Sequence, residues 1–248
     1  MSVFVTAAYA FFPVPELDQL QSELIQFGRA RDMKGLILIA TEGINATVCG
    51  TPIAMEEWKL KLRSLHPEIL FKDSIAEKEI FKRWVVKIKP EIVALKKSDI
   101  RPAGEHRHIS PEAWNRLMQE DDVVVLDTRN DYEVAIGKFA NAVDPKIRSF
   151  QEFPAYVRNS GIPRSKKVLL YCTGGIRCEK AILAMEAEGY ADVYQLEGGI
   201  LNYLEKFPHQ NFKGECFVFD DRVAVDQELK PTKTFRPCPC CGDPVAVV

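Results

Sequence analysis

The sequence predicts two α/β domains in tandem, followed by a tail that contains several cysteines. Up to Pro90, apolar residues recur first with the spacing of strands and then with that of amphipathic helices. Beyond it, short apolar runs rich in valine alternate with helical segments, a pattern typical of a parallel sheet. A chain of 248 residues is long enough for two hydrophobic cores. We therefore predict an α/β protein whose first domain is α+β and whose second domain has a parallel sheet.

Residues 1–92 contain the elements of the first domain in the order β-α-β-β-α-β, which is that of a ferredoxin-like (acylphosphatase-like) sandwich. Thr51-Pro52 gives the second helix an N-cap hydroxyl and a proline in its first turn. Residues 93–109 form a linker by composition. Strands are expected over 3–12, 35–40, 44–49, around 70–71 and over 84–88, and helices over 17–28 and from 52.

Residues 110–210 form the second domain, in which strands and helices alternate. Ligands bind at the C-terminal ends of the strands in such sheets, so the residues that follow each strand are of interest. One strand ends in Asp127-Thr128-Arg129 and another in Cys172, and the tail covers residues 211–248. Strands are expected over 123–126, 168–171 and 193–196, and helices from 110, over 150–157, over 178–188 and after 199.

The most informative stretch is the loop Cys172-Thr-Gly-Gly-Ile-Arg177, between a strand and a helix. The backbone amides that follow Cys172, at the positive end of a helix dipole, would stabilise a thiolate. Gly174 and Gly175 suit a tight ring of amides, and Arg177 adds a permanent positive charge. A buried structural cysteine is the alternative. The order of strand, cysteine, two glycines, arginine and helix favours a nucleophile.

The length of this loop narrows the chemistry. Only Thr173, Gly174, Gly175 and Ile176 separate Cys172 from Arg177, one residue fewer than in protein phosphatases. The loop resembles that of the rhodanese (sulfurtransferase) family, which suits a cysteine persulfide. A phosphatase is therefore disfavoured.

Other motifs make the resemblance more specific. Asp127-x-Arg129, Glu133 and Gly137 match the rhodanese domain, although Gly137-Lys138-Phe139 departs from the usual Gly-His-Ile. Together with the segments 41–47 and 214–225, they are similar to the rhodanese-like, oxygen-dependent tRNA uridine(34) hydroxylases. That resemblance implies hydroxylation of the wobble uridine to 5-hydroxyuridine and binding of the tRNA anticodon region.

The resemblance also implies roles for the residues of the loop. Cys172 matches the catalytic cysteine and residues 173–177 the active-site loop, while Asp127 and Arg129 are expected to support it. Cys178 is either a resolving thiol for a disulfide or persulfide, or a small residue packed beside the loop. Two other functions stay open: a sulfurtransferase fed by thiosulfate or a persulfide, and a non-catalytic RNA-binding module whose loop holds a phosphate.

Composition adds broad expectations. The chain is 46% hydrophobic and 27% charged, as in ordinary globular proteins, and has no apolar run long enough for a membrane span. Its net charge of −2 gives no global basic field, although residues 1–98 carry 14 basic against 12 acidic residues. Seven cysteines, one in a reactive loop, together with an N-terminus unlike a signal peptide, favour the cytoplasm.

The sequence contains neither a nucleotide-binding glycine fingerprint nor a recognisable metal-binding triad, so we expect no bound cofactor. The resemblance implies molecular oxygen as co-substrate. The tail contains Cys238-Pro-Cys-Cys241-Gly242, which matches half of a zinc knuckle. Cys216, with Cys240 or His209, is a candidate for the remaining ligands of a structural zinc. A flexible, redox-sensitive tail is the alternative.

Overall fold

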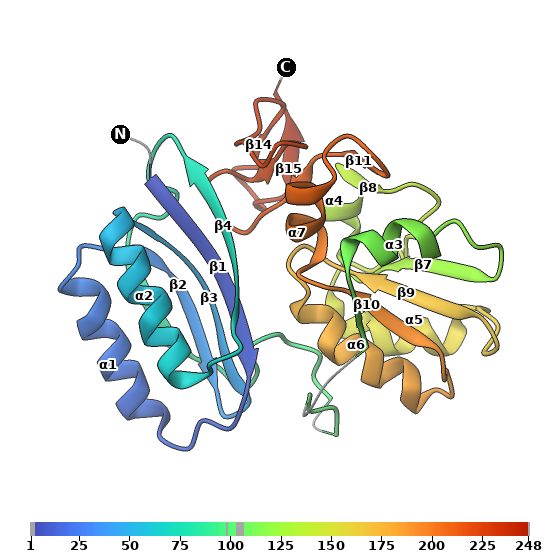
Figure 1. The fold of residues 1–248 in the computed structure, drawn as a ribbon, viewed down its shortest axis with the longest axis horizontal. Coiled ribbons are helices and arrows are strands. Elements are labelled where there is room, and N and C mark those ends of the chain that lie inside the picture. Colours follow the sequence, from blue (N-terminus) through green and yellow to red (C-terminus); the bar gives the residue numbers. More distant parts are fainter. Residues whose placement is uncertain (1–2, 98, 103–106, 248) are drawn as a thin grey trace. The chain divides into compact units, whose positions relative to one another are not determined.

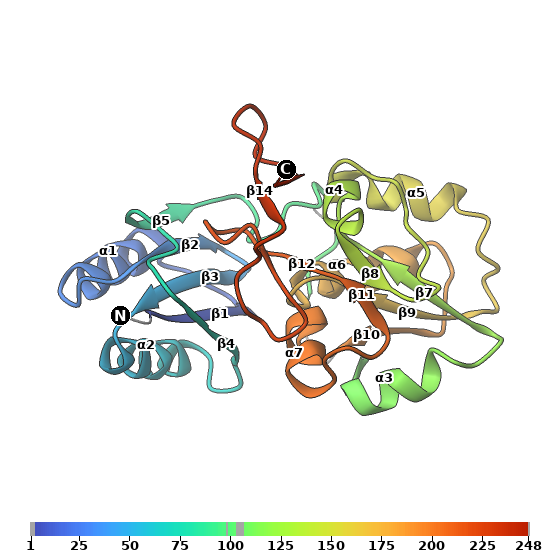
Figure 2. The same cartoon turned by 90° about the horizontal axis from the view of Figure 1, so that it is seen from above.

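The computed structural model describes residues 3–97, 99–102 and 107–247 (Figures 1 and 2). It divides into two compact units, Met1–Ala94 and Leu95–Val248. No helix among these described residues is both long and apolar enough to cross a bilayer.

The first unit is a five-stranded sheet in the order β4-β1-β3-β2-β5. Its first four strands are antiparallel neighbours in the ferredoxin-like order, so this prediction is confirmed. The strand β5 is an addition that pairs in parallel with β2. The elements are β1 (Val3–Phe11), α1 (Leu17–Arg29), β2 (Lys34–Ala40), β3 (Gly43–Gly50), α2 (Pro52–Leu65), β4 (Leu70–Ala76) and β5 (Trp84–Ile88).

Both helices cover the same face of this sheet (Figure 1). The Thr51 hydroxyl accepts a hydrogen bond from the Ala54 amide at 3.3 Å, as the capping pattern predicts. Alternation along β2 separates the two faces: Ile37 and Ile39 are fully buried against the helices, whereas Leu36 and Leu38 are only half-buried. The main core of the unit therefore lies on the helix side of the sheet, and a smaller buried cluster consists of Val5, Cys49, Ala76 and Ile80.

The second unit is built on a parallel sheet in the order β6-β10-β9-β7, as predicted. The helices α3 and α7 pack on one side, and α5 and α6 on the other (Figure 2). The elements are β6 (His108–Ile109), α3 (Pro111–Leu117), β7 (Val123–Asp127), α4 (Asp131–Val134), β8 (Gly137–Phe139), the 3-10 turn Phe150–Glu152, α5 (Phe153–Asn159), β9 (Lys167–Tyr171), α6 (Ile176–Ala187), β10 (Val193–Leu196) and α7 (Gly199–Lys206).

Two segments assigned to the linker and the tail contribute to this second unit. His108 and Ile109 pair with Gln195 and Leu196 of β10, and part of the predicted linker, 98 and 103–106, lies outside the described residues. In the tail, Phe212 and Cys216 enter the core of the second unit. Short strands extend the fold there: β11 (Phe212–Gly214) pairs with β8, β12 (Cys216–Phe217) with β13 (Ala224–Val225), and β14 (Phe235–Pro237) with β15 (Pro244–Ala246).

Candidate active site

Cys172 lies directly after β9 and before α6, with 1% of its surface exposed. The Gly175 amide donates a hydrogen bond to the Cys172 sulfur at 3.1 Å. Gly175 has a φ of +98°, which agrees with the need for glycine there. Gly174 has no such angle, and a Cβ at this residue would meet no atom within 4 Å. The space beside Gly174 is therefore open.

The N-terminus of α7 holds the loop from its other side. The amides of Ile200 and Leu201 donate to the carbonyl oxygens of Cys172 and Thr173, at 3.0 and 3.1 Å. This approach requires Gly199, whose φ is +67° and whose missing Cβ would lie 2.5 Å from the Cys172 carbonyl oxygen. The loop is thus fixed between two helices.

Arg177 forms a buried ion pair with Glu133 on α4. Its two terminal nitrogens donate to the two carboxylate oxygens at 2.6 and 2.7 Å, a bidentate arrangement. Burial raises the pKa of Glu133, but the neighbouring Arg177 and Arg129 outweigh it, so its pKa stays below the ordinary value. The pair therefore remains charged and sets the orientation of the guanidinium beside the loop.

Asp127 and Arg129 form a second buried ion pair below the loop. Arg129 donates to the Asp127 carboxylate at 2.7 to 3.1 Å and to the Gly137 carbonyl oxygen at 2.7 Å. Between them, the Thr128 hydroxyl donates to the Tyr171 carbonyl oxygen at 3.0 Å and lies 3.6 Å from the Cys178 sulfur. This segment thus contacts both the end of β9 and the start of α6.

The site stabilises a thiolate at Cys172. Burial raises the pKa of this thiol, but a hydrogen bond from the Cys178 thiol, the Arg177 guanidinium and the amides of Arg177 and Gly175 outweigh burial and lower it to about 5. Burial and the adjacent thiolate raise the pKa of Cys178 well above its usual range. The surroundings therefore favour the thiolate at Cys172 and the protonated thiol at Cys178.

Comparison with known proteins agrees with this geometry. Residues 3–92 match the UPF0176 acylphosphatase-like domain, and residues 110–206 match the rhodanese-like domain. Relatives named tRNA uridine(34) hydroxylase align with the whole or nearly the whole chain. That of Bdellovibrio bacteriovorus is 45% identical (100% of this chain, 72% of the relative), that of Synechocystis 46% (100% and 91%) and that of Rhizobium etli 44% (97% and 80%). The chain belongs to the tRNA uridine(34) hydroxylase family.

The amino-acid sequence did not predict three contacts of the site in this family member. Glu133 was recognised only as a motif residue, and its partner Arg177 is 44 residues away. Gly199 was interpreted as the start of a helix. Phe219, which is 59% exposed, has its ring 5.8 Å from the Arg177 guanidinium, and only the folded tail brings it there.

The cysteines of the tail are not gathered into one site. Cys216 is fully buried in the core of the second unit, and burial raises its pKa to about 12. Cys238 and Cys241 lie instead at the tip of the β14–β15 hairpin, where the Cys241 and Cys240 amides lower the pKa of Cys238. Within the described part of the chain, no three His, Cys, Asp or Glu side chains stand close enough to hold a metal ion.

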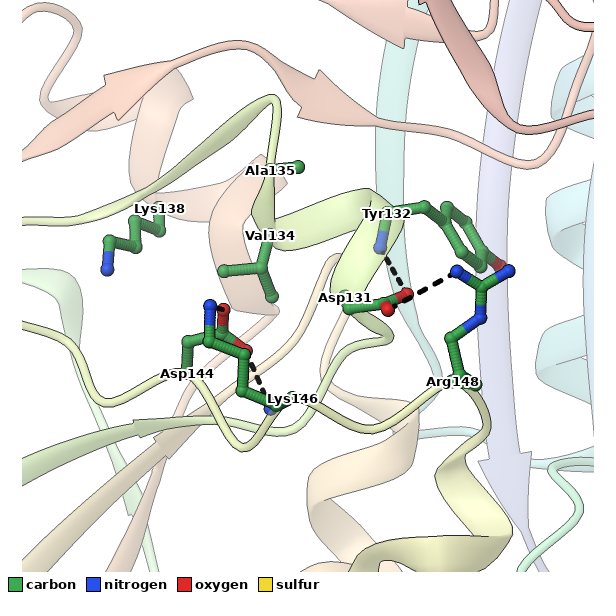
Figure 3. A pocket seen from close by; sticks show the side chains of 8 residues that line it. All are labelled: Asp131, Tyr132, Val134, Ala135, Lys138, Asp144, Lys146 and Arg148. Carbon is green, nitrogen blue, oxygen red and sulfur yellow. Dashed lines mark hydrogen bonds and ion pairs between the residues drawn. The ribbon is translucent and has the colours of Figure 1, made fainter.

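A hollow of about 520 Å³ lies beside α4, outside the Cys172 loop (Figure 3). Four of its five charged side chains form ion pairs: Arg148 with Asp131 at 3.4 Å, and Lys146 with Asp144 at 3.1 Å. The fifth, Lys138, donates to the Ala142 carbonyl oxygen at 3.4 Å. The two ion pairs offset four of these charges, so Lys138 alone gives the hollow a net positive charge of one. Its lining residues are Asp131, Tyr132, Val134, Ala135, Lys138, Asp144, Lys146 and Arg148.

Proposed function

We propose that this chain hydroxylates C5 of the wobble uridine in the tRNA anticodon, with molecular oxygen as co-substrate. The observation that carries the proposal is the buried Cys172 thiol, whose pKa is lowered by the surrounding donors. Such a thiolate is a nucleophile at neutral pH. The identity of the substrate is inferred from the relatives, which are named tRNA uridine(34) hydroxylase. A single-stranded anticodon base can leave its stack and reach a cysteine in a loop.

The proposed first step is addition of the Cys172 thiolate to C6 of uracil. The C5=C6 double bond opens, and its electron pair passes to C5 and the O4 carbonyl. The carbon C5 then bonds to oxygen and, after protonation, becomes a hydroperoxide. Reduction of the hydroperoxide gives C5–OH and water, and loss of the C5 proton together with the C6–sulfur bond returns the thiolate and releases 5-hydroxyuridine.

These reaction steps require two electrons more than uridine supplies to O2. The overall balance is uridine + O2 + 2 thiols → 5-hydroxyuridine + H2O + disulfide. We propose that Cys172 and Cys178 are these two thiols, because the Cys178 thiol already donates a hydrogen bond to the Cys172 sulfur. Cys178 attacks the distal peroxide oxygen and becomes a sulfenic acid, and the released Cys172 thiolate then forms the disulfide and expels water. An external thiol reduces the disulfide before the next turnover.

The test is mass spectrometry of nucleosides from tRNA incubated with the protein in air, with a Cys172→Ser variant as control. We expect wobble uridine to gain one oxygen with the parent chain and not with the variant. Retention of 5-hydroxyuridine in Cys172→Ser would contradict the covalent mechanism.

Two other functions give distinct results in the same samples. A sulfurtransferase leaves uridine unmodified. It takes sulfane sulfur from thiosulfate onto Cys172 and then passes it to cyanide. A non-catalytic RNA-binding module leaves uridine unmodified, and its Cys172→Ser variant keeps its biological effect. We place the reaction in the cytoplasm, where tRNA and reducing thiols are available.

Zinc on the tail stays a prediction, for which Cys238 and Cys241 would supply two ligands.

A further inference from the structure

The tail places an exposed aromatic ring beside the Cys172 loop. The strand β12 contacts the loop directly, because the Thr173 hydroxyl donates to the Phe217 carbonyl oxygen at 3.4 Å. Two residues further along, Phe219 is 59% exposed, and the Arg177 guanidinium lies over its ring at 5.8 Å from the centre. A single exposed apolar residue is ordinary on a protein surface. Phe219 is informative because it borders the arginine of the reactive loop.

Two further aromatic rings support Phe219 from the protein side. The Phe217 ring, which is buried, lies 5.0 Å from that of Phe219 at an angle of 83°. On its other side, the Phe217 ring lies 5.3 Å from that of Tyr132 on α4, at an angle of 76°. Both contacts have the edge-to-face geometry that aromatic pairs favour. The three rings therefore form a packed row, and Phe219 is its exposed end.

The turn that carries Phe219 is held by its own contacts. The Val218 amide donates to the Val223 carbonyl oxygen at 2.9 Å and closes the turn between β12 and β13. Within it, Arg222 donates to both carboxylate oxygens of Asp220, at 2.7 and 2.8 Å. The side chains of this ion pair are only 7% and 1% exposed. Phe219 is thus presented on an ordered turn, so that little conformational entropy is lost when a ligand contacts it.

The chemistry around the ring favours a nucleobase over a phosphate. The Arg177 guanidinium is already paired with Glu133, and Asp221, two residues beyond Phe219, is exposed and would repel a phosphate. Addition of a thiolate to C6 uses one face of the flat uracil ring, which leaves the opposite face available. Aromatic side chains stack on the faces of unpaired bases.

We propose that the Phe219 ring stacks on the pyrimidine of the wobble uridine and so positions its C6 atom for Cys172. Phe219 is then a positioning residue for this base, contributed by the tail rather than by the rhodanese-like domain. The inference rests on the proposed function for the identity of the substrate, and it adds the side chain that holds the base.

The experiment measures this contact separately from the reaction. The full chain carrying Cys172→Ala is titrated into two fluorescent anticodon stem-loops, one with a wobble uridine and one with an abasic site in its place, and Kd is read from anisotropy. Phe219→Ala should raise Kd for the wobble uridine about 10-fold, the effect typical of losing one stacked base. It should leave Kd for the abasic stem-loop unchanged, because that RNA has no base to stack.

Two control variants accompany Phe219→Ala. Phe219→Tyr keeps an aromatic ring and should bind both stem-loops like the parent. Phe4→Ala removes another exposed phenylalanine, on β1 of the first unit, and should leave both Kd values unchanged. In chains that retain Cys172, Phe219→Ala should lower kcat/KM for the wobble uridine about 10-fold, and Phe219→Tyr should restore it.

Each outcome decides the matter, with thermal unfolding used to select folded variants. Equal affinity of Phe219→Ala and the parent for the wobble uridine overturns the proposal. An equal loss of affinity for both stem-loops also overturns it, because the ring then acts elsewhere than on this base, and so does a defect that Phe219→Tyr shares. If the effect of Phe219→Ala depends on the wobble base but the parent chain makes no 5-hydroxyuridine, the proposed reaction fails and the contact stands.

Discussion

At Cys172, two opposing effects act on the same sulfur atom. Loss of water on burial favours the neutral thiol, and nearby donors with the Arg177 charge favour the thiolate. The donors prevail because hydrogen bonds to a charged acceptor contribute about 1.5–3 kcal/mol each. The thiolate is therefore present above the lowered pKa of about 5 and is lost as pH falls through that value.

The Cys178 hydrogen bond can be tested through this titration. Cys178→Ala removes the donor, so the pKa of Cys172 should rise by about one unit or more. Alkylation of Cys172 by iodoacetamide, followed by peptide mass spectrometry across pH, should show its acid limb displaced to higher pH. Cys49→Ala, which removes a buried cysteine of the first unit, should leave the profile unchanged. An unshifted profile in Cys178→Ala would show that this bond does not stabilise the thiolate.

The electron balance gives a second test at the same pair. Without added reductant, the parent chain should make at most one 5-hydroxyuridine per molecule and lose two titratable thiols. Cys178→Ser keeps a hydrogen-bond donor but cannot form the disulfide, so it should make no product until an external thiol is added. Repeated turnover of the parent without reductant would rule out the dithiol as the electron source.

At the scale of elements, the loop depends on how closely α7 approaches it. Gly199→Ala places a Cβ 2.5 Å from the Cys172 carbonyl oxygen at a φ of +67°. We expect a loss of about 2–4 kcal/mol, from left-handed strain and overpacking, together with loss of hydroxylation. Gly189→Ala is the matched control: its φ is +87°, but no atom lies within 4 Å of its Cβ. It should cost only about 1–2 kcal/mol in urea unfolding and keep activity. Equal costs for the two variants would refute the role of the close approach.

Long elements were predictable from sequence, because periodicity over five or more residues reports which face is buried. The helix after Thr51-Pro52 and the strand that ends at Cys172 are examples. The helix α4, with four residues, and the strand β8, with three, are too short to show a period. They were missed, although they support the site. Cys172 and Arg177 could be predicted from the sequence of their loop. The contact of Arg177 with Glu133 and that of Cys172 with Gly199 arise only from tertiary packing.

At the scale of the whole molecule, charge limits how the chain can bind RNA. The net charge is −2, and residues 1–98 carry an excess of only two basic residues. Many lysines and arginines are already engaged in ion pairs, such as Lys59 with Asp73 and Lys61 with Glu23. A wide positive surface that follows the phosphate backbone is therefore not expected, and contacts with the bases have to contribute much of the affinity for tRNA.

This distribution of charge predicts a shallow salt dependence. Each phosphate contact to a single strand contributes about −0.7 to the slope of log K against log salt. With no more than three such contacts, anisotropy titrations of the full chain with a fluorescent anticodon stem-loop should give a slope no steeper than about −2.1. A slope several times steeper would mean that phosphate contacts dominate, since counterion release grows with their number and base stacking does not change it.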